Sequence, residues 1–161
     1  MNYKTFSQSI ENYLVNVPAI LAIDTAARYL GGLDAVLPEK YLYVYVEKII
    51  PELKHLTIKD EDGIYFFKQI KVSSFSKIDY TENFGIKCCT EEQIIKDILK
   101  RGYNYQKKTG LWGLIGYNLT RIIGGYCYNY TVEGARDRLK RILPKRYIDI
   151  FEKIVINNED Y

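Results

Sequence analysis

The residues best suited to bind an anion are concentrated between positions 100 and 146. Eleven lysines and arginines lie in this segment, and only two acidic residues, Glu133 and Asp137, oppose them. Aromatic residues are interleaved with the cations. Cations neutralise phosphates and rings stack on exposed bases, so this composition predicts a nucleic-acid-binding region. Of the two nucleic acids, we expect DNA rather than RNA as the partner. The candidate contact residues are Lys107, Lys108, Trp112, Arg121, Arg136, Arg138, Lys140, Arg141, Lys145 and Arg146.

The rest of the chain has the opposite charge. It carries twelve basic and eighteen acidic residues, so the net charge of +3 hides an acidic front and a basic back. Such asymmetry favours an anionic partner, although the two halves could also simply attract each other. Tyrosine and arginine side chains also suit protein interfaces. The alternative function is therefore a protein-interaction module, for instance an inhibitor from a mobile element that blocks a nucleic-acid-processing protein.

Three further residues have the types needed for metal-dependent cleavage of a phosphodiester. Asp34 and Glu52 provide carboxylates for Mg²⁺, and Lys54 could steady the attacking water. The pattern is short, and Pro51 is unfavourable in a central strand. We therefore expect a non-enzymatic protein without a cofactor, with a nuclease as the alternative.

Cysteine and histidine are scarce. Cys88, Cys89 and Cys127 are odd in number, two of them are adjacent, and no C-x-x-C motif occurs. This usage predicts reduced thiols in a cytoplasmic protein. His55 is the only histidine and has no clustered ligands beside it, so a zinc site is not expected. Cys89 could be a lone nucleophile, but we interpret it as a small buried hydrophobic residue.

Periodicity in the first ninety residues predicts two helices followed by strands. Apolar residues at three- and four-residue steps indicate a helix over about 3–17, which Pro18 ends. A dense apolar run predicts a second helix over 20–30, stopped by two glycines. β-branched and aromatic residues predict a strand over 41–46. Further strands are expected near 56–58, over 64–72, in a run ending near Tyr80, and over 85–89.

The second half of the chain is predicted to be helical. Thr90 can cap a helix, with Gln93 three residues later as in a capping box, and the pair Arg101-Gly102 closes it. The glycine- and aromatic-rich segment 102–130 is compatible with short helices or with strands. A helix is expected over about 131–143, and a last amphipathic helix follows a proline.

Helical spacing could bring several cations of 131–143 together, opposite an apolar face. Arg136 and Lys140 are four residues apart, as are Arg141 and Lys145 if the helix continues. The strongest candidates for phosphate contact are Arg136, Arg138, Lys140 and Arg141. The apolar face is expected to contain Val132, Ala135, Leu139, Ile142 and Leu143.

These elements predict an α+β fold with N-terminal helices, a small, mostly antiparallel sheet and C-terminal helices. At 161 residues we expect a single domain, in which 1–100 form an α+β core and 101–161 a basic, tyrosine-rich helical region. No segment approaches the ~20 apolar residues that span a bilayer, so no membrane partner is expected. The first eight residues lack the apolar core of a signal peptide. A homodimer is left open.

Three segments share a pattern with a known family. Residues 18–33, PAILAIDTAARYLGGL, are similar to a helix of small residues that ends in a glycine-containing turn. Residues 37–46, LPEKYLYVYV, resemble the strand that follows it. Residues 85–99, GIKCCTEEQIIKDIL, resemble a later strand-to-helix stretch. The family is that of the AbiEi-type antitoxins, the abortive-infection family of type IV toxin–antitoxin systems.

The third segment both matches and departs from that family. Thr90 and Asp97 match its Thr-led turn and Asp-bearing helix, whereas Gln93 and Ile94 stand where Arg and Thr are usual. The resemblance, over about residues 18–100, implies a non-catalytic regulator that opposes a nucleotidyltransferase-like toxin and often represses its own operon. About seventeen residues precede the match, too few for the family's winged-helix domain. Any DNA contact is therefore expected after residue 100, with a cognate toxin or another protein as a further partner.

Overall fold

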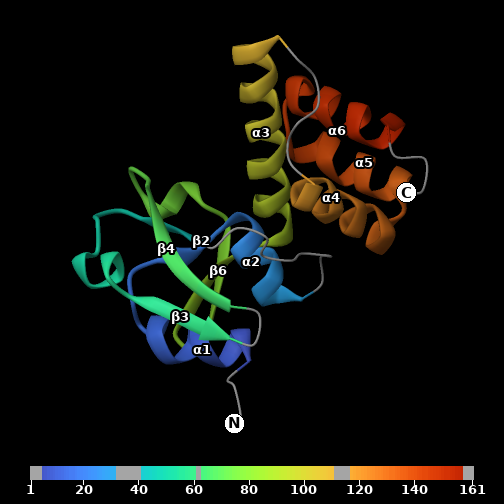
Figure 1. Ribbon diagram of the computed structural model, residues 1–161. Coiled ribbons are helices and arrows are strands. Elements are labelled where there is room, and N and C mark those ends of the chain that lie inside the picture. The colour runs from blue at the N-terminus through green and yellow to red at the C-terminus, as the bar shows by residue number, and fades with distance from the viewer. Residues whose placement is uncertain (1–4, 32–40, 61–62, 111–116, 158–161) are drawn as a thin grey trace.

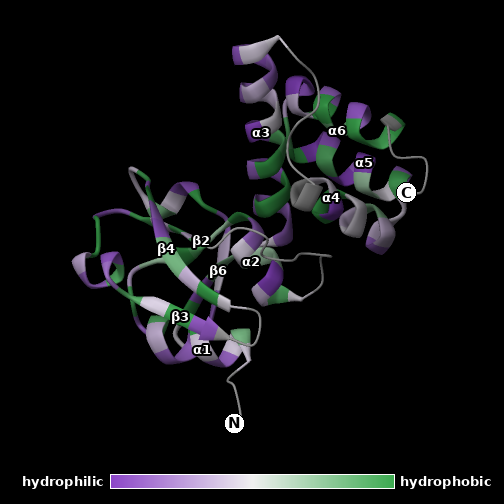
Figure 2. Ribbon diagram, viewed as in Figure 1, coloured by the Kyte–Doolittle hydropathy of each residue, from purple (hydrophilic) through white to green (hydrophobic). Residues whose placement is uncertain are grey.

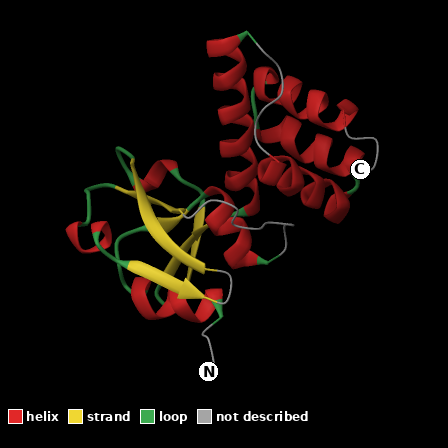
Figure 3. Cartoon of the chain, viewed as in Figure 1, coloured by secondary structure: helices red, strands yellow, loops and turns green. Residues whose placement is uncertain are grey.

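The computed structural model describes residues 5–31, 41–60, 63–110 and 117–157, and it shows a central sheet flanked by helices (Figure 1). Within these residues, six strands form one sheet in the order β3-β4-β2-β1-β6-β5. Most helices that follow the sheet in sequence gather on one side of it (Figure 3). The α+β class is confirmed. The sheet, however, is more central than the small sheet expected from the sequence.

The sheet is mixed. Neighbouring strands β1 and β2, β3 and β4, and β5 and β6 are antiparallel, whereas β1 runs parallel to β6 and β2 parallel to β4. The strands are β1 (Ile20–Leu21), β2 (Tyr41–Val46), β3 (Thr57–Asp60), β4 (Gly63–Lys71), β5 (Tyr80–Asn83) and β6 (Ile86–Cys89). The strand predicted over 41–46 is confirmed at both ends. The strand predicted to end near Tyr80 is wrong, because β5 begins there and the short 3-10 turn η2 (Phe75–Lys77) precedes it.

The first helix has the predicted amphipathic character. Helix α1 (Phe6–Leu14) begins after Thr5, whose hydroxyl accepts a hydrogen bond from the Gln8 N–H while the Gln8 side chain accepts one from the Thr5 N–H. This reciprocal capping box satisfies two backbone donors that the helix leaves unpaired. The buried residues of α1 pack against β3, so the helix covers one face of the sheet at that edge.

The second predicted helix starts too early. Ile20 and Leu21 form strand β1, inserted between β2 and β6, and helix α2 covers only Ile23–Leu30. Both strand residues are fully buried, and periodicity cannot separate a short buried strand from a buried helix turn. The end of α2 is as predicted, because Gly31 adopts a left-handed conformation with φ 74° and its N–H bonds the Ala27 carbonyl.

Helix α3 (Glu91–Thr109) is longer than predicted. Thr90 caps it by accepting a hydrogen bond from the Gln93 N–H. The expected end at Arg101-Gly102 is wrong, since Gly102 is buried inside the helix and the left-handed residue that ends it is Gly110, with φ 69°. A glycine within a helix is only about 1 kcal/mol less favourable than alanine, and packing of α3 against the last helix offsets this.

Three more helices follow α3 in the part of the chain that the structure describes. Helices α4 (Tyr117–Tyr130), α5 (Val132–Ile142) and α6 (Lys145–Asn157) pack with α3, with α3 against α6 and α4 against α5. Both hydrophobic and hydrophilic residues recur along α5 and α6, as they do in amphipathic helices (Figure 2). The segment that the sequence left undecided is therefore helical where the structure describes it. Among the described residues, no helix is long and apolar enough to cross a bilayer.

The boundaries of α5 confirm the sequence prediction, but its apolar face differs by one residue. Thr131 caps the helix through the Gly134 N–H, and the chain turns at Pro144 before α6. Of the predicted apolar residues, Ile142 is exposed, whereas Ala135, Leu139 and Leu143 are buried. Because the helix ends at Ile142, the expected pairing of Arg141 with Lys145 on one helical surface does not occur.

Candidate nucleic-acid interface

The cations of α5 differ in their contacts. Arg136 is bound by another side chain of the protein. Its guanidinium forms a two-bond ion pair with the carboxylate of Glu152 on α6, including a contact of Nη2 to Oε2 of 3.0 Å. The hydrogen bond with Glu152 raises the pKa of Arg136 further above its usual range. A two-bond pair fixes both side chains in orientation. Arg136 therefore ties α5 to α6.

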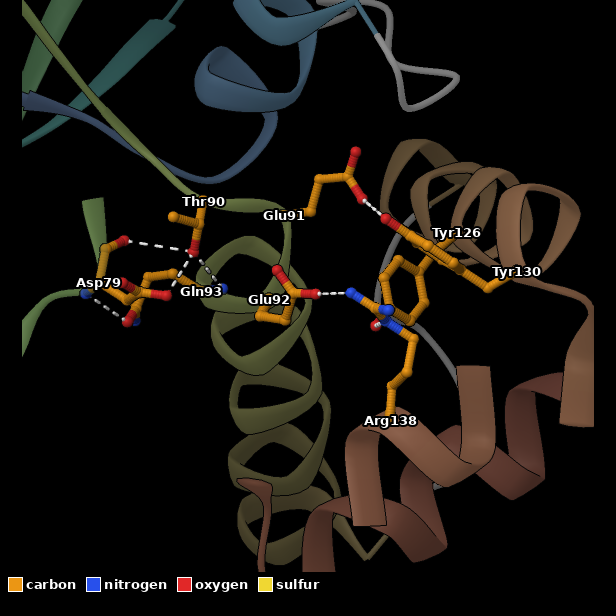
Figure 4. A network of polar contacts seen from close by, with 8 residues as sticks. All are labelled: Asp79, Thr90, Glu91, Glu92, Gln93, Tyr126, Tyr130 and Arg138. Carbon is orange, nitrogen blue, oxygen red and sulfur yellow. Dashed lines mark hydrogen bonds and ion pairs between the residues drawn. The ribbon is translucent and has the colours of Figure 1, made fainter. Parts of the chain in front are cut away.

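Arg138 is the second cation of α5 with internal partners. Its Nη2 donates to Glu92 Oε1 on α3 across 2.6 Å, and its Nε donates to the Tyr126 hydroxyl on α4 across 3.3 Å (Figure 4). The guanidinium also lies 4.1 Å from the centre of the Tyr130 ring, a cation–π distance. The hydrogen bond to Glu92 is the main cause that raises the pKa of Arg138. One side chain thus joins three helices.

The first turn of α3 gathers these contacts with others from the sheet (Figure 4). The Tyr130 hydroxyl donates to Glu91 Oε2 across 3.0 Å, and this bond raises the pKa of the phenol. On the sheet side, the Thr90 hydroxyl donates to Asp79 Oδ2 across 2.8 Å, and the Asp79 N–H donates to Gln93 Oε1 across 3.0 Å. Because the Gln93 carbonyl is engaged by Asp79, the capping box predicted at Thr90 is only half formed. This polar network connects the sheet to the C-terminal helices.

The remaining cations of α5 share their surface with acids. Lys140 and Arg141 are exposed, but Glu133 and Asp137 are exposed on the same helix. Counting 100° per residue, these four side chains lie on one outward sector, opposite the buried Leu139. The outer surface of α5 is therefore mixed in charge rather than basic.

A cationic cavity lies instead between the end of α3 and the start of α6. It has a volume of about 420 Å³ and is lined by Tyr103, Gln106, Lys107, Gly110, Arg146, Asp149, Ile150 and Lys153. The Arg146 guanidinium lies 4.9 Å from the centre of the Tyr147 ring and 5.8 Å from that of Tyr103. The two rings meet edge to face at 5.8 Å. This packing holds Arg146 at the cavity while leaving it exposed. We call Lys107, Arg146 and Lys153 the groove cations.

The other predicted residues are scattered around this cavity or lie elsewhere. Lys108 is exposed in the last turn of α3, and Lys145 is exposed at the first position of α6. Arg121 is half-buried on α4 and has an interaction partner. Trp112 lies outside the described residues. Of the predicted residues, Lys107, Lys108, Lys145 and Arg146 therefore lie on α3 and α6, the two helices that line the cavity.

The sequence did not predict that the lining residues of this groove form one site. Lys153 lies beyond the basic segment, so a count of charges up to residue 146 excludes it. The spacing of Arg146, Asp149, Ile150 and Lys153 on one helical stripe could have indicated it, because residues three and four apart are neighbours on a helix. The partner of that stripe could not be predicted, since α3 was expected to end before Lys107.

The residues considered for metal-dependent cleavage do not form a recognisable centre where they are described. Glu52 and Lys54 are both exposed on the 3-10 turn η1 (Pro51–Lys54), and Asp34 lies outside the described residues. In the described ranges, no three His, Cys, Asp or Glu side chains lie close enough together to hold a metal ion.

The three cysteines are free and buried, as predicted for structural thiols. Burial raises the pKa of Cys88 to about 12 and that of Cys127 to about 11, and it also raises the pKa of Cys89. A thiol with a raised pKa is a poor nucleophile at neutral pH. Cys89 therefore packs as a small hydrophobic residue.

Comparison with known proteins gives no relative from which a role could be transferred. No family model, no curated protein and no solved structure matches the chain. Of the surfaces that carry the predicted cations, the groove between α3 and α6 has the clearest chemistry, because cations and rings lie side by side at a cavity.

Proposed function

We propose that this protein is a non-enzymatic, cytoplasmic regulator that binds nucleic acid, DNA in the first instance, through the groove between α3 and α6. The observation that supports it is the placement of Lys107, Arg146 and Lys153 around one cavity. A single acid, Asp149, is among the lining residues, so cations outnumber acids there three to one. The exposed Lys108 and Lys145 extend the positive surface along both helices.

The binding is electrostatic in character. Lysine and arginine side chains displace the counterions that are condensed on the phosphates, so affinity falls steeply as salt rises, with a slope of about 0.9 per phosphate contact on a duplex. Such contacts position a protein on the backbone without reading sequence. The pattern shared with AbiEi-type antitoxins supports a regulator rather than a catalyst, and the reduced thiols support a cytoplasmic site of action.

The test is fluorescence-anisotropy binding to a labelled random duplex at several salt concentrations. Lys107→Glu combined with Arg146→Glu should weaken binding at least tenfold and lower the salt slope by about 1.8, the share of two phosphate contacts. The matched control is Lys54→Glu with Lys77→Glu, which changes the net charge equally at exposed positions of η1 and η2. Equal weakening by both pairs, or no duplex binding at low salt, would overturn the proposed interface.

One observation favours a second candidate function, a protein-interaction module. Phe84 is 95% exposed at the tip of the β5–β6 hairpin and has φ 53°, a left-handed conformation that is unfavourable for a bulky residue. Tyr13 and Val15 are also exposed, and Val15 lies close to Gly85 of the same hairpin. A pull-down with nuclease present should recover a stoichiometric protein with the native chain and lose it with Phe84→Asn. Recovery of nucleic acid alone would contradict this function.

A further inference from the structure

The sheet presents an aromatic row that the basic-region argument does not include. Register pairs Tyr41 with Phe66 and Tyr43 with Lys68 between the parallel strands β2 and β4. Residues paired in this way have side chains on the same face, and the next residue along each strand points to the other face. The alternation of tyrosine along Tyr41–Val46 thus places three phenol rings on one face, with Phe66 and Lys68 directly beside two of them.

This face remains open at one end of the strands. On the opposite face, Leu42, Ile58 and Tyr65 are buried, on the side that α1 covers. On the aromatic face, Tyr41 is 46% exposed and Phe66 is 47% exposed. Rings on neighbouring strands are about 4.8 Å apart at the backbone, so these two form adjoining surfaces.

The antiparallel neighbour β3 widens the exposed face. Ile64, which precedes Phe66 by two residues on the same face of β4, is 45% exposed. It pairs with Lys59 of β3, and Phe66 pairs with Thr57, so the row continues across three strands. Lys59 is exposed, whereas its neighbour Ile58 points into the core. The open surface is therefore apolar in its middle and cationic along its rim.

The other end of the face is closed by α3. The Tyr45 hydroxyl donates to Asp97 Oδ2 across 2.8 Å, so this ring is buried against the helix. Arg101, one turn further along α3, places its guanidinium 5.2 Å from the centre of the Tyr43 ring. The helix thus supplies both a boundary and a cation to the aromatic row.

The charge on this face suits a polyanion. The Lys68 amine lies 5.5 Å from the centre of the Tyr41 ring and 5.9 Å from that of Tyr43. Together with Lys59 and Arg101, it surrounds the rings with positive charge. Burial raises the pKa of the nearby Asp97 carboxyl, which also accepts hydrogen bonds from Tyr45 and from Gln93. Both oxygens of Asp97 are therefore engaged by side chains of the protein itself.

Exposed rings framed by cations match the chemistry of an unpaired nucleotide. A base offers a flat π face for stacking, and its phosphate pairs with lysine or arginine. Recognition of single strands commonly uses aromatic side chains in this manner, including on the open face of a sheet. If the ligand were instead an apolar protein surface, it could pack against the rings and Ile64. It would offer no anionic group to Lys59, Lys68 and Arg101.

We propose that the face formed by Tyr41, Phe66 and Lys68, with Lys59 and Arg101 at its rim, binds single-stranded nucleic acid by stacking unpaired bases on the two exposed rings. This surface is distinct from the groove between α3 and α6, because it recognises bases whereas the groove cations contact phosphates. The sheet face accounts for the alternating tyrosines, which the basic-region hypothesis leaves unused.

The decisive experiment compares a base-bearing oligonucleotide with an abasic strand of the same length and phosphate number. The native protein should bind the base-bearing strand more tightly, and the combined variant Tyr41→Leu and Phe66→Leu should lose that preference. Leucine keeps apolar area on the strand but has no π face, so the variant isolates stacking from burial. We expect at least about a fivefold loss for each ring, the lower end of what one stacked base contributes. Comparison of DNA and RNA versions of the strand identifies which of the two nucleic acids this face binds more tightly.

The groove variants separate this proposal from the function proposed above. Lys107→Glu with Arg146→Glu should weaken binding of both strands equally and leave the preference for bases intact. Absence of any preference in the native protein, or a preference that survives the leucine variant with unchanged circular dichroism, would overturn base stacking. Concentration-dependent dimerisation that the leucine variant abolishes, without an effect on the strands, would instead assign the face to a second copy of the chain.

Discussion

The guanidinium of Arg138 donates to the carboxylate of Glu92 across 2.6 Å, and this contact joins α5 to the first turn of α3. Glu92 lies just before the basic segment and Arg138 within it, so an acid of the front half binds a cation of the back half. Arg136, also in the basic segment, pairs with Glu152 of α6, an acid that lies beyond that segment. Some of the charge asymmetry therefore serves internal attraction, the alternative left open by the sequence. Only the cations that remain exposed are available to bind an anionic partner.

Removal of the Arg138 contacts should lower stability, whereas removal of a neighbouring surface charge should not. Arg138→Met keeps a long apolar stem but loses the bonds to Glu92 and Tyr126 and the contact with Tyr130. We expect the Tm to fall by a few degrees. The control Arg141→Met should stay within about 0.5 kcal/mol of the native protein, as surface substitutions usually do. Thermal melts followed by circular dichroism measure both, and equal Tm values for the two variants would contradict a structural role for Arg138.

Two glycines with similar backbone angles should respond differently to a methyl group. Gly31 has φ 74° and no atom within 4 Å of an added Cβ, so Gly31→Ala carries only the left-handed penalty of about 1 kcal/mol. Gly85 has φ 79°, and its Cβ would lie 2.8 Å from Asn16 Oδ1 and 2.8 Å from Val15 Cγ2. We expect Gly85→Ala to lose about 2–4 kcal/mol in urea unfolding, because overpacking adds to the strain. If the two variants lose the same amount, the hairpin does not contact the end of α1 as closely as the structure shows.

The sequence was most informative where local chemistry alone decides the structure. The strand over 41–46 was predicted at both ends because β-branched and aromatic residues dominate it, and Thr131 was identified as a helix start from its position before an amphipathic run. The prediction failed where a distant partner decides. Ile20 and Leu21 form a strand because β2 and β6 lie on either side, and Gly102 stays helical because α6 packs on α3.

The same division applies to the candidate sites. The uneven charge distribution pointed to the second half of the chain, but it could not tell Arg138, which is bonded to Glu92, from Arg146, which is exposed at a cavity. The aromatic face of the sheet was visible only as alternation in one strand. Its second ring, Phe66, comes from β4, and the register that pairs it with Tyr41 is a tertiary property.

The buried thiols should make the protein sensitive to alkali. The unfolded chain loses thiol protons near pH 8.5, whereas the folded chain holds those of Cys127 and Cys88 until their pKa values of about 11 and about 12. Between pH 9 and 11 the folded state therefore binds more protons, and the free energy of unfolding falls as pH rises, by about 1.4 kcal/mol per pH unit for each such thiol. Urea titrations at pH 7, 9 and 10.5 measure the slope.

Cys127→Ala provides the control for that slope. The substitution shifts the free energy of unfolding at pH 7 through packing, but it also removes one titrating group, so the fall between pH 9 and 10.5 should become shallower by about 1.4 kcal/mol per pH unit. An unchanged slope would show that Cys127 is not buried as a protonated thiol. Slow reaction of the native thiols with a disulfide reagent at pH 8, against rapid reaction in urea, is the independent check.

Replacement of Phe84 should stabilise the fold. Phe84 and Gly85 both have positive φ in the two-residue turn between Asn83 and Ile86, the geometry in which an Asn-Gly pair is preferred. Phe84→Asn relieves part of a left-handed penalty of about 1–2 kcal/mol and sacrifices little burial, since the ring is 95% exposed. We expect a gain of about 0.5–1 kcal/mol from the urea midpoint with an unchanged m-value. Tyr128→Asn is the control, because Tyr128 is 90% exposed on α4 and should show no gain. A gain confined to Phe84→Asn means that the native chain keeps a destabilising aromatic ring at the hairpin tip, as a protein-binding residue requires, whereas no gain removes that support for the second candidate function.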